Sequence, residues 1–176
     1  MVLIGPSSLL PQALTVPKLQ GITKKNLDDM LVDLNIVNYG NRMHALAGTK
    51  PGKVYKFSKD KAKHLHSNVS PAIMSLGEEA MSVFGKGTSN AMNFTDCVFT
   101  AYSHGGFVGS HNDKDHMCRH FNILSLSFGH TATMIINGHP IEIANAQAII
   151  FDGRQNHCVE PLKGQWRYNF SFRSWN

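Results

Sequence analysis

Cysteine and long apolar runs are both scarce in this chain of 176 residues. Its three cysteines, Cys97, Cys118 and Cys158, are odd in number and widely spaced, which argues against a disulfide framework and favours a reducing compartment. No apolar run is long enough to span a bilayer. The N-terminal stretch is interrupted by prolines and lacks the basic segment of a secretory signal. We therefore expect a cytoplasmic or nuclear protein without a membrane anchor.

Acidic side chains are also in short supply. The chain has 12 of them against 17 lysines and arginines, which gives a formal net charge of +5. A positive surplus favours polyanionic partners, because binding to them releases condensed counterions. The zinc signatures Cys-x-x-Cys and His-Glu-x-x-His do not occur, so neither structural nor hydrolytic zinc is indicated.

What the chain does contain suits one domain, 1–176, that mixes helices with strands. Residues 1–36 have the pattern of a proline-broken arm followed by a helix over 23–36, with Thr23 as its N-cap. A second helix is predicted within 70–95. Each helix carries apolar residues along one face, which indicates packing against a sheet.

The last part of the chain, 96–176, has the pattern of short strands separated by turns. The dipeptide Asn137-Gly138 is a strong hairpin signal, because both residues tolerate a positive φ. Many short strands with turns between them predict a closed or double-sheet β architecture. The strand-like runs are 97–102, 121–128, 131–136, 139–143, 147–151 and 166–173.

Two residues in this region, His111 and Asp113, have the spacing of a metal site. On an extended strand, residues i and i+2 point to the same side, so both side chains can contact one ion. His157 is the candidate third ligand. Two neutral imidazoles and one carboxylate, with the opposite face of the metal open, suit non-haem Fe(II) and leave room for a co-substrate and O₂.

Two arginines near the C-terminus, Arg167 and Arg173, are six residues apart in an alternating stretch. They therefore face the same side of a strand. Planar, two-pronged guanidinium contacts at this spacing could hold a dicarboxylate.

Three segments, His111–His116, Asn156–Lys163 and Arg167–Arg173, together resemble the AlkB family of Fe(II)/2-oxoglutarate-dependent dioxygenases. The last contains the family's Arg-x-Asn-x-Ser-x-Arg ending, and all three occur in family order. The resemblance covers about residues 96–173. It implies an α+β, mainly β fold: a double-stranded β-helix (jelly roll) with supporting N-terminal helices packed on one side, in which 96–176 forms the catalytic core.

The resemblance implies that Fe(II), 2-oxoglutarate and O₂ are used. His111, Asp113 and His157 match the catalytic iron ligands of the family. Arg167 and Arg173 match the arginines that bind the two ends of 2-oxoglutarate.

Further residues match by position. Asn169 and Tyr102 match groups that contact 2-oxoglutarate, and Asp115 matches an acid that reads the damaged base in some members. Thr100 departs from the pattern, because the best-known members have asparagine there. This departure puts one co-substrate hydrogen bond in doubt.

The range 37–69 corresponds to the family's nucleotide-recognition lid, and we expect a substrate lid there. Its basic residues alternate with aromatics, which suits a groove that binds phosphates and stacks bases. Tyr55, Phe57 and His66 are candidate base-contacting residues. The alternative is an exposed hairpin with ordinary surface lysines. The range carries no clear family motif, so only its location is taken from the resemblance.

The implied function is oxidative demethylation of N-alkylated bases in single-stranded or flipped-out DNA or RNA, since a base inside a duplex cannot reach the iron. Two alternatives stay open. One is a 2-oxoglutarate dioxygenase that hydroxylates a small molecule, a nucleoside or a protein side chain. The other is a non-catalytic β-domain that binds nucleic acid. We expect a monomer.

Overall fold

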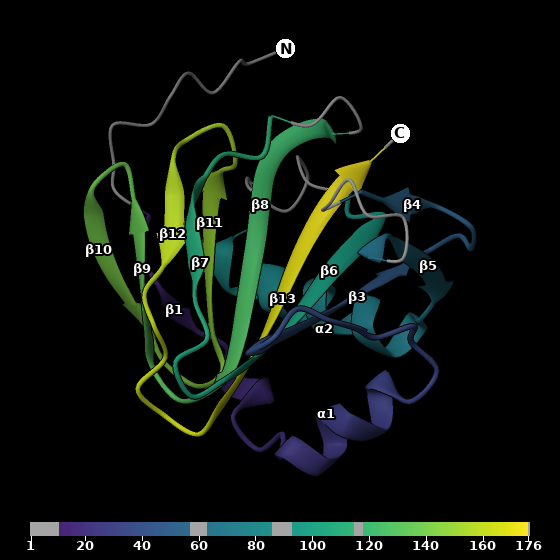
Figure 1. Ribbon diagram of the computed structural model, residues 1–176, viewed down its shortest axis with the longest axis horizontal. Coiled ribbons are helices and arrows are strands. Elements are labelled where there is room, and N and C mark those ends of the chain that lie inside the picture. The colour runs from purple at the N-terminus through teal and green to yellow at the C-terminus, as the bar shows by residue number, and fades with distance from the viewer. Residues whose placement is uncertain (1–10, 57–62, 86–92, 115–117, 176) are drawn as a thin grey trace.

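The computed structural model describes residues 11–56, 63–85, 93–114 and 118–175, and two sheets dominate it (Figure 1). In spatial order, the strands of the large sheet are β1 (Leu14–Thr15), β11 (Gln147–Asp152), β8 (Cys118–Gly129), β13 (Trp166–Trp175), β6 (Asp96–Ser103), β3 (Arg42–Gly48), β5 (Leu65–Val69) and β4 (Val54–Tyr55), with β2 (Val37–Asn38) paired to β3. The small sheet consists of β10 (His139–Ile143), β9 (Ala132–Ile136), β12 (His157–Val159) and β7 (Val108–His111).

The strand β13 shows how the sequence pattern builds these layers. Tyr168, Phe170 and Phe172 are buried in the main apolar core. The residues that alternate with them, among them Arg167 and Asn169, line a cavity on the other face of the sheet. Because side chains alternate across a strand, one decapeptide supplies both the core and the polar wall of a site.

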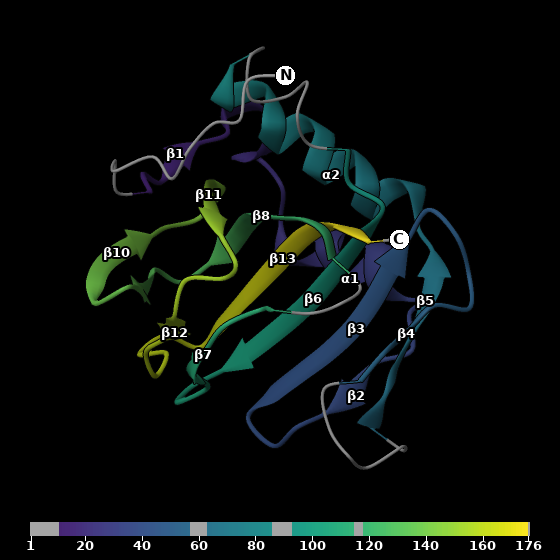
Figure 2. The same cartoon turned by 90° about the horizontal axis from the view of Figure 1, so that it is seen from above.

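Two helices, α1 (Lys24–Leu31) and α2 (Pro71–Met81), cover the core face of the large sheet (Figure 2). The short 3-10 turns η1 (Pro17–Leu19) and η3 (Ser82–Phe84) flank them. Thr23 caps α1 as predicted, in a capping box with Asn26. The helix ends at Leu31 rather than at residue 36, because the chain turns there and then enters β2.

A glycine sets the distance between α2 and the sheet. A Cβ on Gly77 would lie 2.7 Å from Cδ1 of Phe172, a fully buried ring on β13. No real Cβ approaches that closely, so only glycine lets the helix pack at this depth. This contact ties the predicted buttressing helix to the strand that carries the arginines.

The predicted hairpin at Asn137-Gly138 is confirmed. It joins β9 to β10, and its residues have φ values of 48° and 81°. Positive φ at both central positions is the requirement of a type I′ turn. None of the helices in the described part of the chain has the length and apolar character needed to cross a membrane.

The range 37–69, predicted as a lid, contains β2 to β5. Strand β3 lies inside the large sheet between β6 and β5, and His44 to Ala47 are buried. Much of this range is therefore part of the sheet. The sequence did not reveal β3 because a strand buried on both faces lacks an alternating pattern. The lid function of the range stays a prediction.

Candidate metal and co-substrate site

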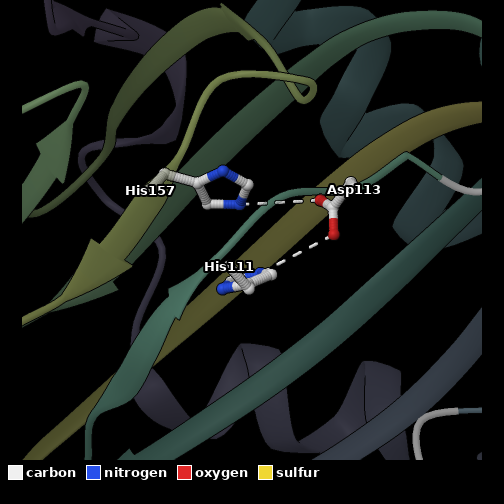
Figure 3. Close-up of side chains that lie close together, drawn as sticks. All are labelled: His111, Asp113 and His157. Atoms are coloured by element: carbon white, nitrogen blue, oxygen red, sulfur yellow. Dashed lines mark ion pairs between the residues drawn. The ribbon is translucent and has the colours of Figure 1, made fainter.

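Three side chains, His111, Asp113 and His157, converge at the edge of the small sheet (Figure 3). His111 ends β7 and His157 begins β12, and the two residues are direct partners across this antiparallel pair. Asp113 follows in the loop, where its N–H donates to the carbonyl of Gly153 over 2.7 Å. The possible ligand atoms of all three lie within 4.8 Å of one another.

Hydrogen bonds set the tautomer of both imidazoles. Nδ1 of His111 lies 2.9 Å from the carbonyl oxygen of Gly109, and Nδ1 of His157 lies 2.8 Å from that of Gln155. A carbonyl only accepts, so each Nδ1 carries the proton. In the neutral rings Nε2 is left with a lone pair, which is the form that binds metals. Burial is the main reason that the pKa of His157 lies below its ordinary value, which favours the neutral ring.

The two Nε2 atoms each lie 3.6 Å from an oxygen of Asp113. That separation is too long for a hydrogen bond. In the neutral tautomers, lone pairs of three acceptors face one another, and a cation between them would relieve the repulsion. The donor set, two imidazoles and one carboxylate, fits Fe(II). Nη2 of Arg173 lies 3.0 Å from Oδ2 of Asp113, so the guanidinium forms an ion pair with that carboxylate beside the imidazoles.

The guanidinium of Arg167 is almost fully buried, with 2% of the residue exposed. Nη1 donates to the carbonyl of Ile143 over 3.0 Å, and Nη2 donates to Oγ of Ser127 over 2.7 Å. No carboxylate among the described residues pairs with it, and burial lowers its pKa to about 10. Its buried Nε has no hydrogen-bond partner in the described structure. A buried cation with an unused donor is suited to an anionic ligand.

Residues on neighbouring strands support this cation. Oδ1 of Asn169 accepts from Oγ of Ser125 over 2.8 Å and from Oγ of Ser127 over 3.0 Å. Tyr102 is the partner of Arg167 across β6 and β13. Burial raises the pKa of Tyr102, so its phenol stays protonated at neutral pH and can donate a hydrogen bond.

The candidate metal ligands and the residues around Arg167 line one cavity with about 630 Å³ of empty space, part of it open to solvent. The structure therefore brings together seven residues for which the sequence predicted a site role, and those roles stay predictions: His111, Asp113, His157, Arg167, Arg173, Asn169 and Tyr102. It adds two residues that sequence reasoning missed, Arg42 and His44 on β3. The two residues are spaced i, i+2, which would place them on one face of a strand. The sequence predicted no strand over residues 42–44, so this spacing was not interpreted.

Comparisons with known proteins agree with this architecture. A scan against models of protein families found no match, and neither did a search of curated proteins. Among solved structures, OsALKBH1 is similar over 98% of this chain and 100% of its own, with 14% sequence identity and a TM-score of 0.67. A protein of the 2OG-Fe(II) oxygenase family from Burkholderia pseudomallei is similar over 85% of this chain and 75% of its own, with 11% identity and a TM-score of 0.53. This chain has the 2OG-Fe(II) oxygenase fold. The predicted fold class, a mainly β jelly roll with helices on one side, is confirmed.

Not every predicted substrate residue lies in the cavity of this oxygenase fold. Tyr55 is buried on β4 and stacks on Trp175, with ring centroids 4.9 Å apart, so it packs within the sheet instead of facing the cavity. His66 lies on the exposed side of β5 and is not among the lining residues. Phe57 and Asp115 lie outside the described residues, and their roles stay predictions.

Proposed function

We propose that this protein is an Fe(II)/2-oxoglutarate-dependent dioxygenase of the AlkB type that oxidatively demethylates N-alkylated bases in single-stranded nucleic acid. One observation supports the oxygenase chemistry above all. A converging set of two imidazoles and one carboxylate shares a cavity with the buried, carboxylate-free cation of Arg167. A binding module has no physical need for both features in one cavity.

Each residue has a defined task in this proposal. His111, Asp113 and His157 would hold Fe(II), and Arg167 would bind a carboxylate of 2-oxoglutarate through its remaining donor. Arg173 orients the Asp113 carboxylate through their ion pair, and its predicted contact with the other end of 2-oxoglutarate stays a prediction. When bound, Fe(II) with 2-oxoglutarate and O₂ supplies the oxidation of a C–H bond. The walls of the cavity restrict water and present one carbon of the substrate to that centre.

Charge and fold favour nucleic acid as the substrate. The chain has a formal net charge of +5, which promotes association with a polyanion. Three arginines line the cavity against a single carboxylate among its described lining residues. The likeness to OsALKBH1 and the resemblance of three sequence segments to the AlkB family agree with this substrate class.

The test is incubation of N-methylated single-stranded DNA and RNA oligonucleotides with the protein, Fe(II), ascorbate and 2-oxoglutarate. With the wild type, we expect mass spectrometry to detect the loss of a methyl group from the oligonucleotide. His111→Ala removes a metal ligand and should abolish the loss. His139→Ala is the matched control, because it makes the same change at an exposed position of β10 outside the cavity.

Two other results would redirect the proposal. Succinate formation without demethylation would keep the dioxygenase and assign its substrate to a small molecule or a protein side chain. Absence of both signals in protein with confirmed iron loading would contradict the enzyme assignment.

A further inference from the structure

The register of β3 against β6 places a third arginine opposite the co-substrate arginine. Arg42 on β3 and Arg167 on β13 are both direct partners of Tyr102 on β6, one from each side. All three residues line the cavity. The Tyr102 side chain therefore stands in a row between two cations, and it divides an Arg167 end of the cavity from an Arg42 end.

Arg42 is the more exposed of the two arginines. Figures 1 and 2 show the small sheet beside β11, β8 and β13, while β3, β5 and β4 extend beyond it on the other side. Arg42 is itself only partly buried, whereas Arg167 is almost fully buried. Of these two arginines, Arg42 is therefore the one in contact with solvent at the cavity wall.

The charges of the cavity leave Arg42 available for a second anion. Arg173 is ion-paired with Asp113, which is the only acid among the described lining residues. Arg167 is assigned above to the co-substrate carboxylate. Within the described structure, no hydrogen bond or ion pair engages the Arg42 side chain. A guanidinium in that state matches the oxygens of a phosphate in a two-pronged contact.

Its neighbour on the same face adds no charge. His44 is 4% exposed, and its Nδ1 lies 3.0 Å from Oγ1 of Thr100. Burial, with a further contribution from Arg42, lowers the pKa of His44 to about 4, so the ring is neutral at physiological pH. This end of the cavity therefore combines one cation with a neutral hydrogen-bonding pair.

Resting on the function proposed above, we propose that Arg42 binds a phosphodiester oxygen next to the target nucleotide, and that the His44–Thr100 pair forms the neutral wall beside it. Arg42 is then a specificity-determining residue for the substrate. It makes the enzyme prefer a nucleotide within a strand to a free nucleoside, which carries no phosphate.

Fluorescence anisotropy tests this assignment on protein loaded with Mn²⁺ and 2-oxoglutarate. Two labelled, N-methylated single strands are compared: one with natural linkages and one with uncharged methylphosphonate linkages beside the methylated base. Arg42→Gln should weaken binding of the natural strand about tenfold, as expected for one charged hydrogen-bonding contact. It should also reduce the slope of log K against log salt by about 0.7.

The neutral strand makes the test specific. Wild-type protein should bind the neutral strand as weakly as Arg42→Gln binds the natural strand. Arg42→Gln should bind the neutral strand no more weakly than the wild type does, because the neutral linkage and the substitution remove the same contact. Arg42→Lys keeps the charge and should restore most of the salt slope. Lys25→Gln is the control for net charge, since it removes one exposed cation from α1 on the opposite face of the sheet.

Three results would overturn the assignment. The first is equal affinity of the wild type and a folded Arg42→Gln for the natural strand. The second is a raised KM for 2-oxoglutarate in Arg42→Gln with an unchanged affinity for the oligonucleotide, which would show that Arg42 binds the co-substrate. The third is failure of the wild type to bind either strand, which would also refute the proposed nucleic-acid substrate and is thereby distinguished from the first two.

Discussion

Replacing Arg167 by methionine separates ligand binding from stability at the centre of the site. Burial lowers the pKa of Arg167 from its ordinary value to about 10, which corresponds to roughly 3 kcal/mol against the charged form in the folded protein. Because the folded-state pKa is the lower one, this cost is fully present below about pH 10 and disappears only as the pH rises towards the ordinary pKa of arginine.

Methionine keeps an unbranched, uncharged stem in place of the guanidinium, so the substitution removes that cost. It also removes the two hydrogen bonds to Ile143 and Ser127, each worth about 1.5 kcal/mol. The two effects are similar in size and opposite in sign. We therefore expect the free energy of unfolding of the ligand-free protein at pH 7 to change by no more than about 1 kcal/mol.

Urea unfolding with Mn²⁺, with and without 2-oxoglutarate, measures both properties. At 100 times Kd, 2-oxoglutarate should stabilise the wild type by about 2.7 kcal/mol and leave Arg167→Met unchanged. Arg154→Met is the matched control, because it alters an exposed arginine that pairs with Asp152. A loss of more than about 3 kcal/mol in ligand-free Arg167→Met, with stabilisation by 2-oxoglutarate intact, would refute the reasoning and make Arg167 a structural residue.

Three further predictions concern the metal and the packing around the site. Asp113→Asn should weaken Mn²⁺ binding by more than the 10- to 100-fold loss that is typical when a partner of a ligand is removed, because Asp113 is the one carboxylate in the ligand set of the described residues. Calorimetry measures this, and an unchanged affinity would exclude Asp113 as a ligand. Gly77→Ala should lower the free energy of unfolding by about 1–3 kcal/mol, because the new Cβ would lie 2.7 Å from the Phe172 ring. An unchanged midpoint of urea unfolding would show that the ring can move aside. Lys53→Met should lower the free energy of unfolding by about 3–5 kcal/mol in the same assay, because it leaves the fully buried Asp96 without its 2.6 Å ion pair. A loss below about 1 kcal/mol would contradict this assignment of a buried ion pair.

Local sequence determined the parts of this protein that depend on short-range geometry. The spacing of His111 and Asp113 was sufficient to propose that both contact one ion, and the structure confirms that they face each other. The alternation of β13 was sufficient to predict that its two arginines face the same side of the strand, and both line the cavity. Thr23 and Asn137-Gly138 were interpretable because caps and type I′ turns depend on the residues within them.

Tertiary structure decided everything that depends on pairing between distant strands. His157 reaches the other ligands because β12 pairs with β7, a register that no local pattern encodes. Arg42 and His44 join the cavity because β3 pairs with β6, although their segment shows no strand period. Tyr55 packs on Trp175 near the C-terminus, so an aromatic residue that suits base stacking by composition is buried in the sheet. The sequence by itself determined which chemical groups are available, and long-range strand register decided which of them share a cavity, because register depends on the burial of the whole sheet.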